Sequence, residues 1–419
     1  MIAADPHSGR VRTMAPTGRT AVRRLLMTAT AIAVTAIAAQ PAAAGSFGPC
    51  PAGTKRADGG DVCVSRTDPR GAKALREVRR VRDVQKTRAT MFGVWAGGRL
   101  LAQGAIGPSL TGVPATRDMH FRIGNTTEVF LTTLLLQLVD RHRIRLSDKV
   151  SRWYPDVPDA DRITVDMLAR SISGLPDYVT MSPFVDANNA DPFRHWTAKE
   201  LNGYLTGTTP LFTPGTSWAF SDSNFVLLGR ILRRVGGAPV ASQLRRRILG
   251  PLGLHQTRMR ANGEVQSPAL HAFSGERGVY EDATFWDASW TTYTADMTSD
   301  LDDMGVWARA FGRGTLLSRA SARRQTGPQN VGLGPLTKAR YYAMGVAVVG
   351  GWVVANPQLQ GFNGIVANLP SRDLTVVISS TQTPQNSPTT TYSVYFFRRI
   401  AKMLTGIEPD LPANPRPHG

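Results

Sequence analysis

The order in which strand-like and helix-like patterns follow each other along the chain limits its fold most strongly. Two strand patterns, joined by the hairpin signal Gly97-Gly98, make up the segment MFGVWAGGRLLAQGAIG. Strand patterns return only late, in YYAMGVAVVGGWVV and LTVVISST, and the stretch between holds mostly short helices and Pro/Gly loops. Strands at both ends with helices between them predict an α+β fold, with one sheet built from the two ends and an inserted, mostly helical domain.

Apolar periodicity predicts the main helices. The segment VFLTTLLLQLV, residues 129–139, is apolar on nearly every face, so it should form a buried helix. Residues 70–86 are charged and helix-prone, and a helix near 391–404 follows the last strand pattern. The clearest helical pieces between the strand regions are ITVDMLARSISGLPDY and NFVLLGRILRRVG. We expect a sheet part at about 70–128 and 335–405, and a helical insertion at about 129–334.

The N-terminus has the features of a secretory signal peptide. Arg23-Arg24 precede the apolar run LLMTATAIAVTAIAA, and small residues follow it, with a cleavage site after Ala44. The run is shorter than the ~20 residues of a membrane-spanning helix. We predict that residues 1–44 are removed on export by the Sec or the twin-arginine route. The mature protein is then secreted or extracytoplasmic, with no membrane span.

Both cysteines, Cys50 and Cys63, follow this cleavage site. In an oxidising compartment they should form one disulfide, which closes a Gly-rich loop within an N-terminal segment at 45–69. The seven histidines are dispersed, and none pairs with a cysteine at metal-ligand spacing. We therefore expect no metal and no cofactor.

The formal net charge of +18 would suit anionic partners such as nucleic acid. The basic residues are scattered, however, without an aromatic-interleaved basic stripe or a nucleic-acid motif. We expect a solvated basic surface, no nucleic-acid partner and a monomer.

Four blocks of sequence carry a recognisable pattern. They are FRIGNTTEVFLTTLLLQLVDRHRIRLSDKVSRWYPDVP, ITVDMLARSISGLPDY, FTPGTSWAFSDSNFVLLG and LPSRDLTVVISS. In order and spacing they resemble the serine β-lactamase-related family, which includes class C β-lactamases, D-alanyl-D-alanine carboxypeptidases and related esterases. The resemblance covers residues 70–405, and a Pro-rich tail follows at 406–419. It implies a β-lactamase/DD-peptidase-like fold, with an antiparallel sheet flanked by helices and an inserted helical domain.

The catalytic motifs of that family fall on other residue types here. The Ser-x-x-Lys motif, at a helix N-terminus, lands on Asn125 and Glu128, and the Tyr-x-Asn motif lands on Phe220 and Asp222. The Lys- or His-containing Gly-rich strand lands near VVANPQLQGFNG, with Ala355 at the basic position. No lysine of the chain has a serine three residues before it, so Ser-x-x-Lys occurs nowhere in the sequence. The resemblance thus implies a member that has lost nucleophile, base and relay.

The replacing residues suit a structural role. Asparagine is a favoured helix N-cap, and Glu128 three residues after Asn125 predicts a capping-box-like arrangement. Thr126 and Thr127 lie off the face that these two residues share and have no evident base, so neither is a convincing nucleophile. Phe220 keeps the ring of tyrosine without its hydroxyl, which favours packing. The candidates for contacts with a ligand are Asn125, Glu128, Ser221 and Asp222.

Three functions stay open. The leading hypothesis is a non-catalytic binding or scaffold protein of the cell envelope, whose former active-site cleft holds an unknown ligand, with a cell-wall peptide as a candidate. The alternatives are a hydrolase that uses Glu128 and Asp222 as an acid/base pair, and an esterase or peptidase-like enzyme with an unrecognised serine. The two acidic residues favour a cationic ligand. The site would instead be neutral if Glu128 capped its helix and Asp222 paired with an arginine.

Overall fold

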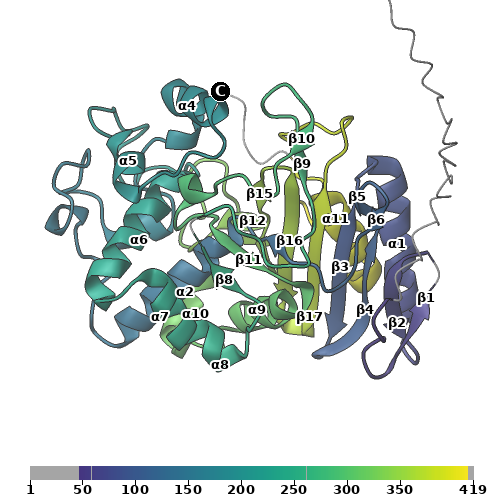
Figure 1. Ribbon diagram of the computed structural model, residues 1–419. Coiled ribbons are helices and arrows are strands. Elements are labelled where there is room, and N and C mark those ends of the chain that lie inside the picture. The colour runs from purple at the N-terminus through teal and green to yellow at the C-terminus, as the bar shows by residue number, and fades with distance from the viewer. Residues whose placement is uncertain (1–46, 58, 261, 414–419) are drawn as a thin grey trace, which may run out of the picture. The chain divides into compact units, whose positions relative to one another are not determined.

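The computed structural model describes residues 47–57, 59–260 and 262–413 (Figure 1). The predicted signal peptide at 1–44 and the end of the predicted Pro-rich tail, from residue 414, lie outside the described residues. Within the described ranges, no helix has both the length and the hydrophobicity that crossing a membrane requires.

The main sheet joins the two ends of the chain. Its central pair is β3 (Thr90–Ala96) and β17 (Leu374–Thr381), which run antiparallel with Phe92 opposite Ile378. In the described part of the chain ten strands belong to this sheet, in the order β1-β2-β4-β3-β17-β16-β14-β13-β12, with β15 paired to β16. The other strands are β1 (Thr54–Ala57), β2 (Asp61–Ser65), β4 (Arg99–Ile106), β12 (Arg340–Tyr342), β13 (Ala347–Val349), β14 (Trp352–Ala355), β15 (Gln358–Leu359) and β16 (Phe362–Leu369). The prediction of an α+β fold, with an antiparallel sheet built from both ends, is confirmed.

Different helices cover the two faces of the sheet. Because side chains of a strand alternate between faces, Phe92 points to one side and its neighbour Met91 to the other. On the first side, α1 (Pro69–Gln85) and α11 (Ser393–Thr405) pack against each other and against the strands. On the second side, α9 (Leu301–Arg313) packs against β3, β16 and β17. Both α1 and α11 agree with the helices that the sequence predicts at 70–86 and near 391–404.

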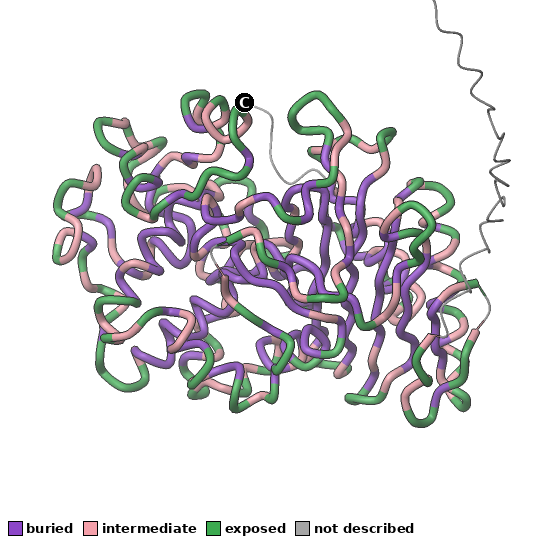
Figure 2. The backbone as a smooth tube through the Cα atoms, viewed as in Figure 1, coloured by how far each residue is buried: buried purple, intermediate pink, exposed green. Residues whose placement is uncertain are grey.

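The second side also holds the predicted apolar helix, α2 (Thr126–Asp140), which is buried over nearly its whole length (Figure 2). Its apolar residues contact other elements all around, and Phe130 stacks on Trp307 of α9 with ring centroids 3.9 Å apart. Helix α2 therefore links the sheet side of the core to the helical region, and its first turn is held in a fixed place.

The region between the two halves of the sheet is mostly helical. Its helices are α3 (Val165–Ala169), α4 (Ser182–Ala190), α5 (Ala198–Gly203), α6 (Asp222–Gly236), α7 (Val240–Leu244), α8 (Gly250–Leu252), α9 and α10 (Arg319–Thr326). Short strands that the sequence pattern did not indicate are β5 (Pro108–Leu110), β6 (Val113–Pro114), β7 (Phe121–Arg122), β8 (Arg258–Met259), β9 (Phe273–Ser274), β10 (Glu281–Asp282) and β11 (Met297–Ser299). Strands of two or three residues are too short to show alternation, and only their pairing, such as β11 with β7 and β8, reveals them.

The N-terminal segment is more regular than the expected loop. Cys50 and Cys63 form the predicted disulfide, with Cα atoms 5.6 Å apart. Strands β1 and β2 form a hairpin, and β2 extends the main sheet by pairing with β4. The buried carboxylate of Asp61 in β2 accepts hydrogen bonds from Arg56 of β1 and from Arg117. It thereby connects the hairpin to the segment that contains Arg117.

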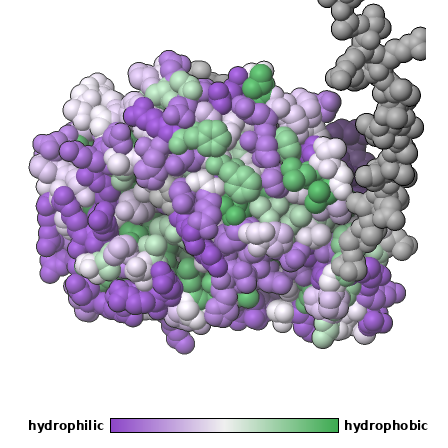
Figure 3. Space-filling view, viewed as in Figure 1, coloured by the Kyte–Doolittle hydropathy of each residue, from purple (hydrophilic) through white to green (hydrophobic). Residues whose placement is uncertain are grey.

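Hydrophilic residues cover most of the face in Figure 3, and hydrophobic residues form small groups among them.

Candidate functional site

The five positions that the resemblance assigns to catalysis lie on three segments of the chain. Asn125 immediately precedes α2 and Glu128 lies in its first turn. Phe220 and Asp222 lie where the chain enters α6, and Ala355 ends β14. Hydrogen bonds connect the first two segments directly, and the residues after Ala355 approach the start of α2.

The start of α2 does not form the predicted capping box, so that prediction is wrong. The backbone of Asn125 is already helical, with φ −61° and ψ −4°, and its side chain makes no capping hydrogen bond. The Asn125 Nδ2 atom instead donates to Glu128 Oε1 at 2.8 Å. A capping residue needs extended backbone to turn its side chain onto the free N–H groups, and Asn125 lacks it. Its amide therefore points at the neighbouring polar groups.

Glu128 is buried in a polar network. Its side chain is 1% exposed, Oε1 accepts from Asn125, and Oε2 accepts from the Tyr342 hydroxyl at 3.0 Å. Burial raises the pKa of Glu128 well above its usual value, and the nearby carboxylates of Asp222 and Asp177 raise it further. Burial likewise raises the pKa of Tyr342 well above its usual value, and Glu128 adds to this. Both groups therefore resist ionisation more strongly than they would in water.

Asp222 reaches the same network from α6. Its Oδ1 atom accepts from Asn125 Nδ2 at 3.5 Å, and its backbone N–H donates to Asp177 Oδ1 at 3.1 Å. One amide nitrogen thus contacts two carboxylates, 2.8 Å from Glu128 Oε1 and 3.5 Å from Asp222 Oδ1. These two oxygens can therefore be no farther apart than the sum of the two distances. The Asn125 amide is a neutral bridge between the acidic groups.

Ser221 faces the opposite way from its neighbours. Its backbone is extended, with φ −156° and ψ 121°, so the side chains of Phe220 and Asp222 point to the other side. The Ser221 hydroxyl is fully buried and donates to the carbonyl oxygen of Pro176 at 3.1 Å. That hydrogen bond holds the loop before α6.

Three aromatic rings lie beside the carboxylates. Tyr342 contacts Trp218 with ring centroids 5.6 Å apart and Phe220 with centroids 6.3 Å apart. The rings are inclined to one another, by 45° and 79°, and all three side chains are half-buried. Sequence reasoning missed Tyr342, because the strand pattern of YYAMGVAVV does not say which tyrosine faces α2.

Ala355 brings no polar side chain to the site. It is 5% exposed and pairs with Val366 of β16. Two residues later, Pro357 lies so close to Gly124 that a Cβ atom there would come within 2.5 Å of the proline Cβ. Gly124 also has a left-handed φ of 45°, so glycine fits this approach. The segment after β14 thus contacts the start of α2 through Pro357.

Nearby hydroxyl groups are buried. The hydroxyls of Thr126 and Thr127 are fully buried and have no hydrogen-bond partner within the described ranges, so no base activates them. The described residues also contain no group of three or more His, Cys, Asp or Glu side chains arranged to hold a metal ion.

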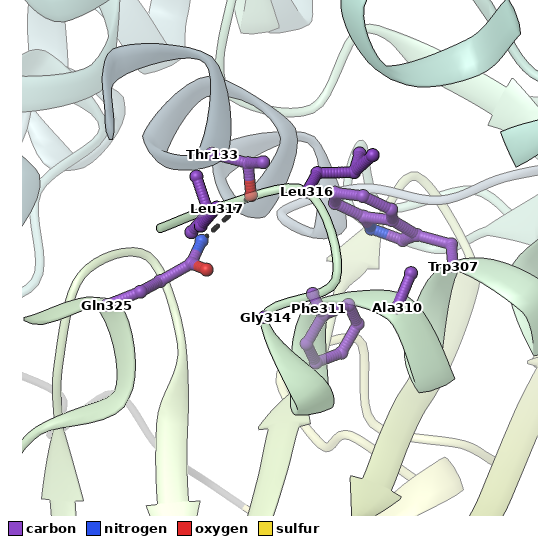
Figure 4. Close-up of a pocket in the computed structure, with 8 residues that line it drawn as sticks. All are labelled: Thr133, Trp307, Ala310, Phe311, Gly314, Leu316, Leu317 and Gln325. Carbon is purple, nitrogen blue, oxygen red and sulfur yellow. Dashed lines mark hydrogen bonds between the residues drawn. The ribbon is translucent and has the colours of Figure 1, made fainter. Parts of the chain in front are cut away.

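Two hollows lie away from this network. The first, between α2, α9 and α10, is lined mainly by apolar side chains, and Gln325 Nε2 donates to Thr133 Oγ1 across it at 2.9 Å (Figure 4). It has no room for a water molecule, so it is a small packing gap. The second is open, measures ≈ 310 Å³ and is lined by Arg194, Trp196, Glu200, Gly203 and Tyr204.

Comparisons with known proteins agree with this fold. A family model described as Beta-lactamase matches residues 76–395. Among curated relatives, Penicillin-binding protein 4 of Amycolatopsis lactamdurans is 27% identical over 42% of this chain and 46% of its own length. D-aminopeptidase of Gluconobacter oxydans is 27% identical over 47% of this chain and 37% of its own length. The chain spans about half the length, or less, of these curated relatives.

Solved structures show the same fold at low identity. A D-stereospecific amidohydrolase from Streptomyces sp. superposes with a TM-score of 0.71 at 23% identity, over 80% of this chain and 99% of that one. D-amino acid amidase from Ochrobactrum anthropi SV3, complexed with L-phenylalanine amide, superposes with a TM-score of 0.69 at 19% identity, over 80% and 99% of the two chains. At these identities the likeness concerns the fold.

Proposed function

The chain belongs to the Beta-lactamase family, a family of serine hydrolases, and on this basis we propose that it is a non-catalytic member whose former catalytic site serves for binding. The observation that carries the proposal is the Asn125–Glu128 hydrogen bond at the start of α2, where the family's serine and lysine would stand. A carboxamide and a buried carboxyl group take the places of the nucleophile and its base.

Each replacement removes a chemical capacity. The Asn125 amide cannot form an acyl-enzyme, and Glu128, with its raised pKa, favours the neutral form. Phe220 has no hydroxyl to relay a proton, and the Tyr342 hydroxyl has a raised pKa and already donates to Glu128. Removing a nucleophile or its base alone costs about 10⁶-fold in rate in a serine hydrolase. Losing both leaves no covalent route through these positions.

The proposed location is outside the cytoplasm. The Cys50–Cys63 disulfide supports this, because disulfides persist in oxidising compartments. Curated relatives are named penicillin-binding proteins, which supports a cell-envelope protein with a cell-wall peptide as a candidate ligand. Mass spectrometry of exported material should find an N-terminus near Gly45. An N-terminus at Met1 would contradict the export proposal.

An acid/base hydrolase is the second candidate. The Asn125 amide holds Glu128 and Asp222 close together, and burial raises the pKa of Glu128. Two carboxyl groups with different environments can act as general acid and general base. The Tyr342 hydrogen bond and the Asn125 bridge occupy both oxygens of Glu128, however, which favours binding over proton transfer to a substrate.

A hydrolysis assay separates the two candidates. Nitrocefin, p-nitrophenyl butyrate and D-alanine amide are incubated with the wild-type protein and with the Glu128→Gln/Asp222→Asn double variant. We expect both proteins to hydrolyse each compound at the uncatalysed rate. Turnover by the wild type that the double variant loses would establish the acid/base hydrolase. Turnover that persists in the double variant would point to an unrecognised serine.

A further inference from the structure

We propose that the surface at the C-terminal ends of α2 and α6 binds an anionic phospholipid membrane through a cluster of exposed arginines. This cluster, the arginine surface, comes from the loop after α2, the last turn of α6 and the turn that follows α7. Its members are Arg141, Arg143, Arg233, Arg234, Arg245 and Arg246, and all six are exposed. The proposal goes beyond the proposed function, because it concerns another part of the molecule.

Positive charge is concentrated in the two stretches of sequence that carry these arginines. Residues 140–162 and 230–247 contain twelve arginines and lysines against five aspartates, a net charge of +7. These stretches make up about a tenth of the chain but hold more than a third of its formal charge of +18. So large a local excess attracts anionic partners.

Hydrogen bonds bring the three segments together. The Arg143 side chain donates to the carbonyl oxygen of Val235 at 3.3 Å, which connects the loop after α2 to the end of α6. From α2, Gln137 Nε2 donates to the carbonyl oxygen of Arg247 at 3.2 Å, in the π-helical turn Arg245–Leu249. Figure 1 places α7 at the lower left, and hydrophilic residues predominate there in Figure 3. The three segments therefore contribute to one surface.

The arginine surface lacks the carboxylate partners that neutralise other arginines. In the adjoining loop, Arg152 pairs with Asp148 and Arg162 pairs with Asp159. Among the residues that the structure describes, no carboxylate lies within ion-pair distance of any of the six arginines. Their charges are therefore available to an external anion. Arginine suits phosphate in particular, because its planar guanidinium can donate two parallel hydrogen bonds to it.

The acidic residues of the region do not cancel this excess. Asp140, at the end of α2, accepts hydrogen bonds from the backbone N–H and the hydroxyl of Ser318 and from the hydroxyl of Ser321. Asp156 and Asp161, in the loop between α2 and α3, are exposed and oppose the binding of an anion. The six arginines still outnumber these three carboxylates two to one.

Stabilisation of helix ends explains only part of this arrangement. Arg233 and Arg234 lie in the last turn of α6, where a positive charge interacts favourably with the helix dipole. Arg245 and Arg246 instead lie in the middle of the continuous helical segment that α7, the π-helical turn and α8 form. Such turns are rare and are frequently found at functional sites. An exposed pair of arginines on this turn therefore favours binding over capping.

The aromatic residues beside the arginines favour a membrane over a nucleic acid. The guanidinium groups of Arg230 and Arg234 lie 4.1 and 4.4 Å from the ring centre of the half-buried Tyr154. Arg152 lies 5.2 Å from the ring centre of Trp153. Half-buried rings that arginines cover offer little surface on which nucleic-acid bases could stack. Tryptophan and tyrosine beside basic residues are instead typical of the membrane–water interface.

Attachment should depend on charge and not on insertion. The exposed large hydrophobic side chains of the described chain lie outside residues 140–162 and 230–247. Without such side chains, a protein adsorbs reversibly to lipid head groups, and salt weakens the contact. Helices α2 and α6 both begin at the former catalytic site and end at the arginine surface. Each has 15 residues, so the site would stand about 20 Å from the lipid.

Co-sedimentation of the full chain with lipid vesicles tests the proposal. One set of vesicles contains phosphatidylcholine alone, and the other contains equal amounts of phosphatidylcholine and phosphatidylglycerol. We expect binding to the anionic vesicles that is lost when NaCl is raised from about 0.1 M to about 1 M, which shortens the Debye length from about 10 to about 3 Å. Equal binding to both kinds of vesicle, binding that salt does not weaken, or no binding would overturn the proposal.

Variants separate the arginine surface from the rest of the chain, including the basic and apolar residues at 23–39. Arg245→Gln/Arg246→Gln should weaken binding to the anionic vesicles at least about tenfold, because each arginine near such a surface contributes about fivefold. Arg76→Gln/Arg80→Gln removes the same charge from exposed positions of α1, across the sheet, and should leave binding unchanged. Equal losses in the two variants would mean that net charge alone drives attachment, and would overturn the assignment to this surface.

A second pair and a soluble polyanion complete the test. Arg141→Gln/Arg233→Gln alters two other segments of the arginine surface and should weaken vesicle binding to a similar extent. Vesicle binding that both pairs of variants retain would overturn the proposal. Capture of a fluorescent DNA duplex without binding to the anionic vesicles would assign the arginines to a soluble polyanion and would also overturn it. The variants leave the former catalytic site unchanged, so the hydrolysis assay and the sedimentation can fail independently.

Discussion

The two faces of the main sheet bury different kinds of side chain. Under α1 and α11 the core is apolar, with fully buried residues such as Phe397, which packs edge-on against Trp352 with ring centroids 5.2 Å apart. The other face adjoins a second apolar core that also encloses ionisable groups, including Glu128 and Asp296. Arg122 is buried there as well, and its guanidinium donates to backbone carbonyls between residues 263 and 286.

The two faces therefore differ in what burial contributes to stability. Apolar burial stabilises a fold by roughly 25 cal/mol per Å² of apolar surface, whereas a buried carboxyl group costs free energy unless its partners compensate. The first face therefore contributes mainly to the stability of the fold. On the second face, burial raises the pKa values of Glu128 and Asp296, and perturbed ionisable groups of this kind are typical of binding or catalytic sites.

The largest expected effect is on the apolar face. Phe397→Ala removes a ring that is fully buried against Trp352 and should lower the free energy of unfolding by about 3–5 kcal/mol. Denaturant unfolding measures this. Phe193→Ala, at a position that is 65% exposed, is the control and should change stability by less than about 0.5 kcal/mol. Equal losses of stability in the two variants would show that the buried Phe397 contributes no more than the exposed Phe193.

The second prediction concerns a buried carboxyl group on the other face. Burial raises the pKa of Asp296 to about 7, although Asp296 Oδ2 accepts the backbone N–H of Tyr293. Between the unfolded pKa of about 3.9 and about 7 the folded state binds more protons than the unfolded state, so stability falls as pH rises through this window. Asp296→Asn should remove up to about 4 kcal/mol of this pH dependence.

Unfolding curves of both proteins from pH 4 to pH 8 test this sign. Other groups with raised pKa values, such as Asp300 at about 6, act in the same direction, so the difference between wild type and variant is the relevant quantity. A variant that is less stable than the wild type at pH 8 and as stable at pH 4 would show the opposite sign.

The third prediction concerns the edge of the apolar face, where Val62 and Val64 of β2 join the core beside the disulfide. Replacing both Cys50 and Cys63 by alanine should cost about 2–3 kcal/mol, because the bond closes a loop with a sequence separation of 13. Thermal unfolding with and without reductant checks this in the wild type as well. An unchanged melting temperature would show that the disulfide contributes nothing measurable to stability.

The smallest effect should come from the ion pair between α1 and α11. Arg399 Nε lies 3.0 Å from Glu77 Oε2, and both side chains are partly exposed. Glu77→Gln should therefore cost less than about 1 kcal/mol. A larger loss would mean that charge, and not apolar packing, holds these helices together.

The fold could be predicted from the sequence because its signals are local. The hairpin at Gly97-Gly98, the apolar run that became α2 and the late strand patterns each specify their own segment, and their order specifies the sheet. The disulfide followed from the presence of only two cysteines, both after a predicted export signal. The short strands β7, β8 and β11 have no such signal, since their pairing depends on segments far apart.

The site could be predicted only in part. Motif positions identified Asn125, Glu128, Phe220 and Asp222 as candidates, and the structure brings the first two together with Asp222. The hydrogen bond from Tyr342 to Glu128 joins residues 214 positions apart, and no sequence spacing encodes it. The expected helix cap failed for a related reason, because the Asn125 side chain is directed by its tertiary neighbours and not by local preference.

We propose that the positions of the family's nucleophile and base, Asn125 and Glu128, carry no working nucleophile. Intact-mass spectrometry after incubation with a fluorophosphonate and with benzylpenicillin tests it most directly. We predict that the wild-type mass stays unchanged, and that the Asn125→Ser/Glu128→Lys variant gains little labelling because Phe220 and Asp222 still lack the relay groups. A stoichiometric adduct on any serine or threonine of the wild-type protein near the start of α2 would contradict it.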